Sequence, residues 1–288
     1  MSDDDRLGGL FEPHELDGLR SIAFVVLDSL RWDSFQRAPT PVLDALAPLQ
    51  EKRYAYASWT LPSHACLLSG LLPYRPRARP AADTYLSDQS LWAHALAGDA
   101  AARNRMLPDF SLAAFAQRCG WSTAGRVAMP VLNPSTGFSR GFDDYRLSPR
   151  GSRLADQVES LAELPEAHRR FVFVNCVDTH YPYDLPPDEM ARVSGAHGAL
   201  AGAVDPSGRP PPDPSDAEQM AELHDAQVRS LTAADAAFAK LADALPRPLL
   251  LVAVSDHGDL FGEDGRFGHG PFFHRALFEV PLAAGVVR

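Results

Sequence analysis

The amino-acid sequence predicts an α/β protein, a three-layer α/β/α sandwich around a mainly parallel sheet. Three runs of apolar and β-branched residues, 21–27, 171–177 and 249–255, suit strands that are buried on both faces. Segments with helical spacing separate these runs, and alternation of strands with helices favours a parallel sheet. Each run is followed directly by an aspartate: Asp28, Asp178 and Asp256. Since the carboxyl ends of parallel strands meet at one edge, we expect a shared site there.

The helices are expected in six segments between these runs. They are residues 41–50, 63–72, 86–96, 111–119, 152–164 and 215–245. Thr40 is a candidate N-cap, Pro41 suits a first helical turn, and Gly120 is typical of a helix end. Residues 122–127 add a candidate strand.

The predicted domain organisation is simple. Residues 1–20 form an acidic tail, and residues 21–288 form the α/β domain. The segment 195–214 is rich in glycine, alanine and proline, and its composition fits a lid over the site or an inert linker equally well.

Composition narrows the class of protein. The 288 residues are 45% hydrophobic and 22% charged, which is typical of a globular protein with a sizeable core. A net charge of −10 disfavours a nucleic-acid partner, and no apolar run is long enough to span a membrane. An anionic substrate stays open, because a bound cation can reverse the local field.

The location is predicted from the first residues and from the cysteines. The start, Met1 to Arg6, is acidic and has no apolar run behind it, which predicts a cytoplasmic protein. Cys66, Cys119 and Cys176 lie far apart, which fits a reducing compartment, and all three are predicted to be small core residues.

Thr60 is the candidate nucleophile. It stands in Ser58-Trp59-Thr60-Leu61-Pro62-Ser63-His64, directly before a predicted helix whose free N–H groups favour an anion. A metal ion that lowers the pKa of its hydroxyl would let it attack a phosphorus or sulfur centre. The alternative is that Thr60 and Ser63 only cap the helix.

Histidines accompany the strand-end aspartates. His257 follows Asp256 and precedes a glycine, so the pair offers oxygen and imidazole ligands to a metal. His269 lies between two glycines and His180 lies just beyond a strand, before Tyr181-Pro182-Tyr183. Such positions offer little core to fill, which favours metal or substrate binding.

Taken in chain order, these segments resemble the alkaline phosphatase superfamily, in its sulfatase-like branch. The resemblance runs from about residue 21 to the C-terminus. It rests on Asp28 and on residues 58–70, 137–145 (with Gly141-Phe142-Asp143), 178–183, 255–258, 262–265, 268–270 and 279–282.

Four departures from the sulfatase pattern refine what the resemblance implies. Thr60 stands where sulfatases carry the cysteine or serine that becomes formylglycine, and threonine cannot be converted. His64 replaces an arginine, and Ser29 replaces a second aspartate. The sequence ends at Arg288, so we expect the usual smaller C-terminal subdomain to be lacking. These differences favour the phosphoesterase or phosphotransferase members, in which threonine acts directly.

The resemblance also implies roles for single residues. Asp28, Thr60, Asp256 and His257 are expected to bind a divalent cation, Zn²⁺, Mn²⁺ or Mg²⁺. Thr60, His180 and His269 are the expected catalytic residues, and His64, His180 and His269 are expected to contact substrate. A candidate second ion would lie between Asp178, His180 and His269, although the Asp178–His180 spacing differs from that of two-metal relatives.

The predicted function is metal-dependent hydrolysis of a phosphate mono- or diester through a threonine nucleophile. Three alternatives stay open: sulfatase-like hydrolysis of other esters without formylglycine, phosphotransfer to an acceptor alcohol, and a non-catalytic binding descendant of the fold. The expected partner is a small anionic ester, with no nucleic acid and no membrane.

Overall fold

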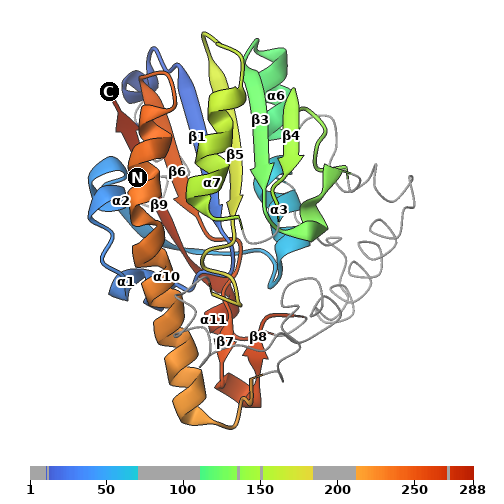
Figure 1. Cartoon of the computed structure of the whole chain (residues 1–288), viewed down its shortest axis with the longest axis vertical. Coiled ribbons are helices and arrows are strands. Elements are labelled where there is room, and N and C mark those ends of the chain that lie inside the picture. Colours follow the sequence, from blue (N-terminus) through green and yellow to red (C-terminus); the bar gives the residue numbers. More distant parts are fainter. Residues whose placement is uncertain are drawn as a thin grey trace, which may run out of the picture.

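A seven-stranded sheet forms the centre of the computed structural model (Figure 1). The structure describes residues 11, 13–70, 111–134, 137–149, 152–183, 212–270 and 273–288. The sheet order is β2-β9-β6-β1-β5-β3-β4. Its strands are β1 (Ser21–Leu27), β2 (Leu49–Tyr54), β3 (Ser122–Val127), β4 (Asp144–Leu147), β5 (Arg170–Cys176), β6 (Leu249–Val254) and β9 (Glu279–Val287).

Parallel pairing dominates the sheet. Strand β1 pairs in parallel with both β5 and β6, and β3 pairs in parallel with β5 and β4. Only β9 runs antiparallel to its neighbours, β6 and β2. The predicted mainly parallel sheet is therefore confirmed. A two-stranded hairpin, β7 (Leu260–Phe261) with β8 (Phe267–Gly268), lies beyond the carboxyl end of β6.

Helices cover both faces of the sheet, which gives the three predicted layers (Figure 1). One face packs against α1 (Trp32–Arg37), α2 (Pro41–Leu46), α7 (Leu154–Glu159) and the 27-residue α10 (Ala217–Asp243). The other face packs against α3 (Thr60–Ser69) and α6 (Leu112–Arg118). Short elements complete the description: α11 (Arg275–Phe278) and the 3₁₀ turns Pro13–Leu16, Pro130–Leu132, Ser160–Glu163 and Glu263–Gly265.

Side chains on opposite sides of the central strands explain this layering. Val25 and Val174 point into a core with Phe238 and Leu241 of α10. Val26, Phe171 and Phe173 point into the second core, which also contains Leu61 and Leu68 of α3. Strands that are buried on both faces read as continuous apolar runs, which is why these strands were predictable.

Several predicted boundaries differ from the structure. The helix predicted over 41–50 ends at Leu46, because the residue before Pro48 disfavours helical geometry, and β2 begins at Leu49. The helix predicted over 152–164 ends as α7 at Glu159 and continues as a 3₁₀ turn. Thr40 precedes α2 but forms no cap with its side chain.

Other expectations for single elements have mixed outcomes. The Ser111 hydroxyl caps α6, which ends just before Gly120 as predicted. Cys66 and Cys176 are buried, but Cys119 is exposed, because it lies at the outer end of α6. The predicted helix 86–96 and residues 195–211 of the candidate lid lie outside the described residues.

The region predicted as a tail contains ordered contacts. Pro13–Leu16 form a 3₁₀ turn, and the Glu15 carbonyl accepts a hydrogen bond from Arg288 at 3.2 Å. The Arg20 amide donates to the Pro248 carbonyl at 2.9 Å. None of the described helices is both long enough and apolar enough to cross a membrane.

Candidate functional site

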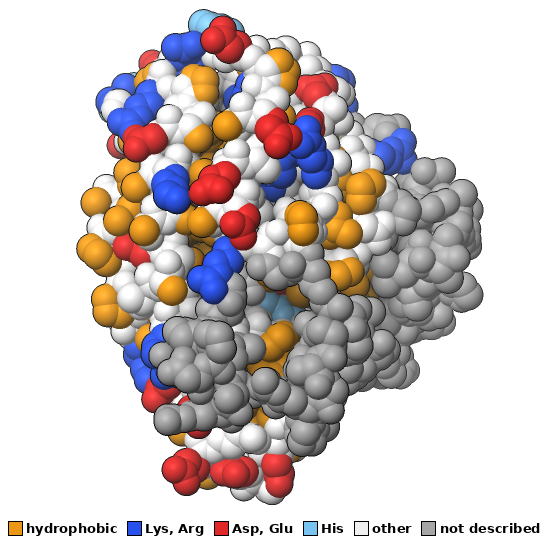
Figure 2. Space-filling model, viewed as in Figure 1, with side chains coloured by type: hydrophobic (Ala, Val, Ile, Leu, Met, Phe, Trp, Pro, Cys, Tyr) orange, Lys and Arg blue, Asp and Glu red, His pale blue; other side chains and the backbone are white. Residues whose placement is uncertain are grey.

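The carboxyl ends of β6, β1 and β5, neighbours in the sheet, carry the predicted site residues to one place. Asp28 directly follows β1, and Asp256 follows β6 by two residues. A histidine side chain is visible near these strand ends in the space-filling view (Figure 2). The structure thus brings together residues that are more than two hundred positions apart in the sequence.

The centre of the site contains two buried carboxylates and one buried imidazole. The His257 Nε2 atom lies 3.4 Å from Asp256 Oδ2 and 3.7 Å from Asp28 Oδ1. Thr60 Oγ1 lies 3.4 Å from the same nitrogen, so the four residues predicted as metal ligands converge. We call Asp28, Thr60, Asp256 and His257 the carboxylate half of the site.

The tautomer of His257 determines whether its Nε2 atom can bind a cation. The Nδ1 atom donates to the Gly258 carbonyl at 3.0 Å, so Nε2 carries a lone pair. Burial lowers the pKa of His257, more than the negative charge of Asp256 raises it, so the ring is neutral near pH 7. A lone pair therefore faces two carboxylates, which is repulsive unless a cation lies between them.

The Asp256 carboxylate gives an independent test of whether a cation fits. Its Oδ1 atom accepts the Ser29 and His257 amides at 3.1 and 3.0 Å, whereas the buried Oδ2 accepts no hydrogen bond of good geometry and lies 3.3 Å from His64 Nδ1 and 3.4 Å from His257 Nε2. A buried and unpaired carboxylate oxygen is costly, and a metal ion is one of the partners that satisfies it. Two carboxylate oxygens, an imidazole nitrogen and a hydroxyl fit Zn²⁺, Mn²⁺ or Mg²⁺.

Thr60 lies at the first position of α3 and is only 4% exposed. The loop before it is fixed by Ser58, whose hydroxyl donates to the Gly270 carbonyl at 2.6 Å, and by Ser63, which donates to the Ala57 carbonyl. The Thr60 side chain forms no cap of the helix. Its hydroxyl is instead directed toward His257, which supports a chemical role over the capping alternative.

Asn175, near the end of β5, was not singled out by the sequence analysis. Its side chain contacts both Asp28 and His64. Its Oδ1 atom accepts the Met129 and Ala128 amides at 3.0 and 3.3 Å, so its amide nitrogen must face the other way. That nitrogen donates to Asp28 Oδ2 at 2.8 Å and lies 3.3 Å from His64 Nε2.

His64 consequently has both ring nitrogens occupied. Because Asn175 presents a donor, His64 Nε2 is the acceptor, and Nδ1 donates to the Thr60 carbonyl at 2.8 Å. The ring is fully buried beneath Thr60. The prediction that His64 contacts substrate is therefore not supported by its position. Its Nδ1 atom also lies 3.3 Å from Asp256 Oδ2, so the ring contacts both the backbone of Thr60 and a proposed metal ligand.

The partly open side of the site is made by His180 and His269. Their ring centroids lie 5.2 Å apart, and the His269 ring is 4.3 Å from that of His257. His180 Nδ1 contacts the Tyr181 carbonyl, which leaves Nε2 to face a ligand. The His269 side chain is 24% exposed, in contrast to the fully buried His257.

Asp259 is a further residue that the sequence analysis missed. It is 1% exposed, and its Oδ1 atom accepts His269 Nδ1 at 2.7 Å. Burial lowers the pKa of His269, but the adjacent Asp259 carboxylate more than reverses this, so the pKa of the ring is raised. We call His180, Asp259 and His269 the histidine half of the site. The only signal in the sequence was an acid two residues after His257.

Asp178 does not join this half, contrary to the prediction for a second ion. Its Oδ2 atom accepts the Leu154 amide at 2.9 Å, at the start of α7, and the Cys176 thiol at 3.0 Å. Burial raises the pKa of this carboxyl group. The structure instead groups ligand atoms of His257, Asp259 and His269 within 4.8 Å of one another, and it groups those of Asp28, His64 and Asp256 in the same way.

Gln227 of α10 holds the two strand-end loops against the helix. Its Nε2 atom donates to the Ser29 and Thr179 carbonyls at 3.0 and 3.1 Å. Its Oε1 atom accepts the Ser34 hydroxyl at 2.7 Å and the Arg31 amide at 3.3 Å. One buried amide therefore fixes the residues that follow Asp28 and precede His180.

Arg31 fixes the hairpin that carries the histidine half. Its guanidinium forms ion pairs with Asp33 and Glu263, each at 2.6 Å, and NH1 also donates to the Asp259 carbonyl at 3.3 Å. Gly258 is required where this hairpin begins, since a Cβ atom would lie 2.0 Å from the Ala276 carbonyl oxygen.

Neither a protein-family model nor a curated protein matches the sequence, but solved structures match most of the chain. The C-terminal periplasmic domain of EptC from Escherichia coli, in complex with Zn, is 17% identical with a TM-score of 0.60. The match covers 94% of this chain and 73% of that one. The phosphonate monoester hydrolase of Agrobacterium radiobacter is 17% identical with a TM-score of 0.59, over 92% of this chain and 68% of that one.

A third structure, the soluble domain of lipooligosaccharide phosphoethanolamine transferase A from Neisseria meningitidis, is 14% identical. Its TM-score is 0.59, and the match covers 94% of this chain and 77% of that one. A Vibrio parahaemolyticus protein of the alkaline phosphatase superfamily also matches, at 14% identity and a TM-score of 0.53. The chain thus has the alkaline phosphatase-like fold that the sequence resemblance predicted.

Proposed function

We propose that this protein is a metal-dependent enzyme that cleaves a phosphate ester through a covalent phosphothreonine at Thr60. One observation carries the proposal: Thr60 Oγ1 lies 3.4 Å from His257 Nε2, a lone pair that faces the buried carboxylates of Asp28 and Asp256. A structural role for Thr60 does not require this arrangement.

Asp28, Asp256 and His257 would hold the divalent cation, with Thr60 Oγ1 completing the set. When bound, the cation lowers the pKa of the Thr60 hydroxyl and screens negative charge on the phosphoryl oxygens. The Zn-containing EptC structure makes zinc the first ion to test. A second ion near His257, Asp259 and His269 is the alternative to this arrangement with a single ion.

The proposed reaction has two steps. In the first, the Thr60 hydroxyl releases its proton to solvent and Oγ forms a bond to phosphorus, while the bond from phosphorus to the leaving oxygen breaks and a histidine protonates that oxygen. His269 suits this role because Asp259 fixes its Nδ1–H and stabilises the protonated ring. His180 would hold a non-bridging oxygen. In the second step, an oxygen nucleophile gives its proton to the same histidine and attacks phosphorus, the bond from phosphorus to Thr60 Oγ breaks, and Thr60 regains a proton from solvent.

The nature of that second nucleophile separates two candidate functions. Water makes the enzyme a hydrolase of phosphate mono- or diesters, which is the function we favour from the sequence. An acceptor alcohol makes it a phosphotransferase, and two of the similar structures, EptC and transferase A, favour this second candidate. Sulfate-ester hydrolysis is disfavoured because Thr60 cannot become formylglycine.

We also propose a class of substrate and a test of the protein's location. A small anionic ester is the proposed substrate. The EptC structures are of periplasmic domains, so a fractionation experiment is needed to decide the location.

The covalent step is tested by intact-mass measurement. Protein loaded with Zn²⁺ or Mn²⁺ is mixed with a panel of aryl phosphate monoesters, diesters and phosphonates and quenched in acid. We expect one phosphoryl group, mapped to Thr60 by peptide sequencing, and none in Thr60→Ala. Turnover that persists in Thr60→Ala would contradict the proposal and indicate direct attack by water.

A further inference from the structure

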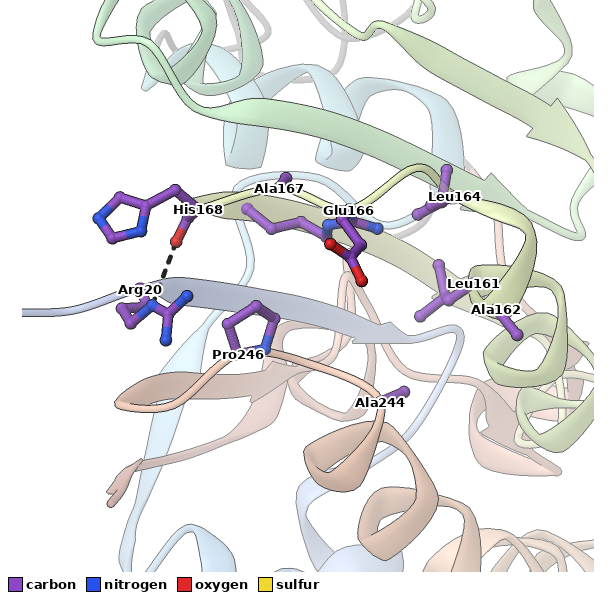
Figure 3. A pocket seen from close by; sticks show the side chains of 10 residues that line it. Arg20, Leu161, Ala162, Leu164, Glu166, Ala167, His168, Ala244 and Pro246 are labelled. Carbon is purple, nitrogen blue, oxygen red and sulfur yellow. Dashed lines mark hydrogen bonds between the residues drawn. The ribbon is translucent and has the colours of Figure 1, made fainter.

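A cavity of about 630 Å³ lies at the amino-terminal edge of the sheet, opposite the site described above (Figure 3). It lies between the starts of β1 and β5, the segment 161–168 and the end of α10. Arg20 directly precedes β1, and Arg170 is the first residue of β5. A volume of this size is within the range of small-molecule sites, roughly 300–1,000 Å³.

Arg170 is a buried cation that has no counter-ion among the described residues. The residue is only 6% exposed, and its neighbour Arg126, unlike Arg170, forms an ion pair with Asp144. One terminal nitrogen donates to the Pro165 carbonyl, and the buried Nε atom has no hydrogen-bond partner. Burial lowers the pKa of Arg170, and the nearby charge of Arg126 lowers it further. A missing anion would account for each of these features.

Arg20 provides a second guanidinium at the same cavity. Its Nε atom donates to the His168 carbonyl at 3.3 Å, which Figure 3 shows as a dashed line. Within the described part of the chain, its terminal nitrogens form no other hydrogen bond, so they stay available to a ligand. Glu166 is the one carboxylate in the lining, and its side chain is exposed.

The rest of the lining is mainly apolar. Leu161, Leu164 and Pro246 contribute carbon surface beside the two arginines. An inorganic ion alone would leave this surface in contact with water, whereas a molecule that has both a charged group and a carbon skeleton would cover it.

We propose that this cavity is a second binding site, for a small molecule with a phosphate or carboxylate group. Arg20 and Arg170 bind the oxyanion through their guanidinium N–H groups, and Leu161, Leu164 and Pro246 contact the carbon skeleton. Arginine is the side chain best suited to such oxyanions, because its planar N–H groups match their geometry. The site is separate from the proposed catalytic chemistry and does not depend on it.

The test is thermal unfolding with two probes, inorganic phosphate and citrate, against sodium chloride of equal ionic strength. At about ten times the dissociation constant, either probe should raise the midpoint by about 2–4 °C. A shift with phosphate alone identifies a phosphate-bearing ligand, and a shift with citrate identifies a carboxylate. No shift with either probe overturns the proposal.

Variants test whether the shift of the thermal midpoint arises from binding at the cavity. Arg170→Gln and Arg20→Gln should each lose it, and the second variant carries the test if the first does not fold. Arg169→Gln is the matched control, because this neighbouring arginine lies over Trp121 and does not line the cavity. Glu166→Gln should lower the dissociation constant by removing the one opposing charge.

The proposed catalytic site could also bind phosphate, and His269→Ala separates the two sites. The shift should persist in His269→Ala. A shift that is lost in His269→Ala but kept in Arg170→Gln and Arg20→Gln would contradict the proposal, as would equal loss in Arg169→Gln.

Discussion

The carboxylate half and the histidine half of the site lie side by side but are held by different means. Asp28 and Asp256 follow central strands directly, and backbone amides and Asn175 fix their oxygens. His180 and His269 lie in loops beyond the strands, and a single buried carboxylate, Asp259, orients His269. The fully enclosed half is suited to hold an ion and a nucleophile, whereas the partly exposed half is suited to meet a substrate.

The largest effect on activity is expected in the carboxylate half, at Thr60. Thr60→Ala should lower kcat by about 10⁴-fold or more, because the nucleophilic oxygen is lost. Bound metal should stay near the wild-type level, since one of about four ligands is removed. Thr60→Ser should retain part of the activity. Steady-state kinetics and elemental analysis on the same samples check both expectations, and loss of metal together with activity would make Thr60 mainly a ligand.

A smaller effect, about 10²-fold in kcat, is expected for His269→Ala in the histidine half. The thermal midpoint should change by only a few degrees, because the side chain is partly exposed. A large fall in the midpoint with near-normal turnover per folded molecule would instead show that His269 is structural.

The pH profile sharpens this assignment through Asp259. As the general acid, His269 must be protonated, so kcat should fall as the pH rises through its pKa. Asp259 raises that pKa, and Asp259→Asn should therefore move the alkaline limb to lower pH and reduce kcat by about 10- to 100-fold. An unchanged alkaline limb in Asp259→Asn would assign that limb to another group.

The smallest effect is expected from the support beneath Thr60. Asn175→Leu removes the donor to Asp28 and to His64, and also the acceptor for two backbone amides. We expect about 10-fold weaker metal binding and a loss of stability of about 1–3 kcal/mol. Asn133→Ala, at a half-buried asparagine that ends the neighbouring 3₁₀ turn, is the matched control. Equal metal affinity in Asn175→Leu and wild type would argue against this support.

The sequence correctly predicted the buried strands, because a strand that is buried on both faces requires a continuous run of apolar residues. Continuous apolar runs identified β1, β5 and β6, and the residues after them identified Asp28 and Asp256. The edge strand β2 was missed because it pairs only with β9 and its side chains are largely polar and exposed.

Within the site, the sequence could not predict roles that depend on the direction in which a side chain points. Asp178 and Asp259 both follow a strand closely, but only the structure shows that Asp178 turns toward α7 and Asp259 toward His269. His64 is likewise only four residues from Thr60 in sequence, but it contacts Asn175, which lies more than a hundred positions away.

The central claim, that the carboxylate half holds the metal ion, is tested most directly by counting bound metal in two matched variants. Asp256→Asn and Asp178→Asn each remove one buried negative charge that follows a central strand. After loading with Zn²⁺ and removal of free ion, we expect Asp256→Asn to lose stoichiometric metal and Asp178→Asn to keep it. Stoichiometric metal in Asp256→Asn, or its loss only in Asp178→Asn, would contradict the account.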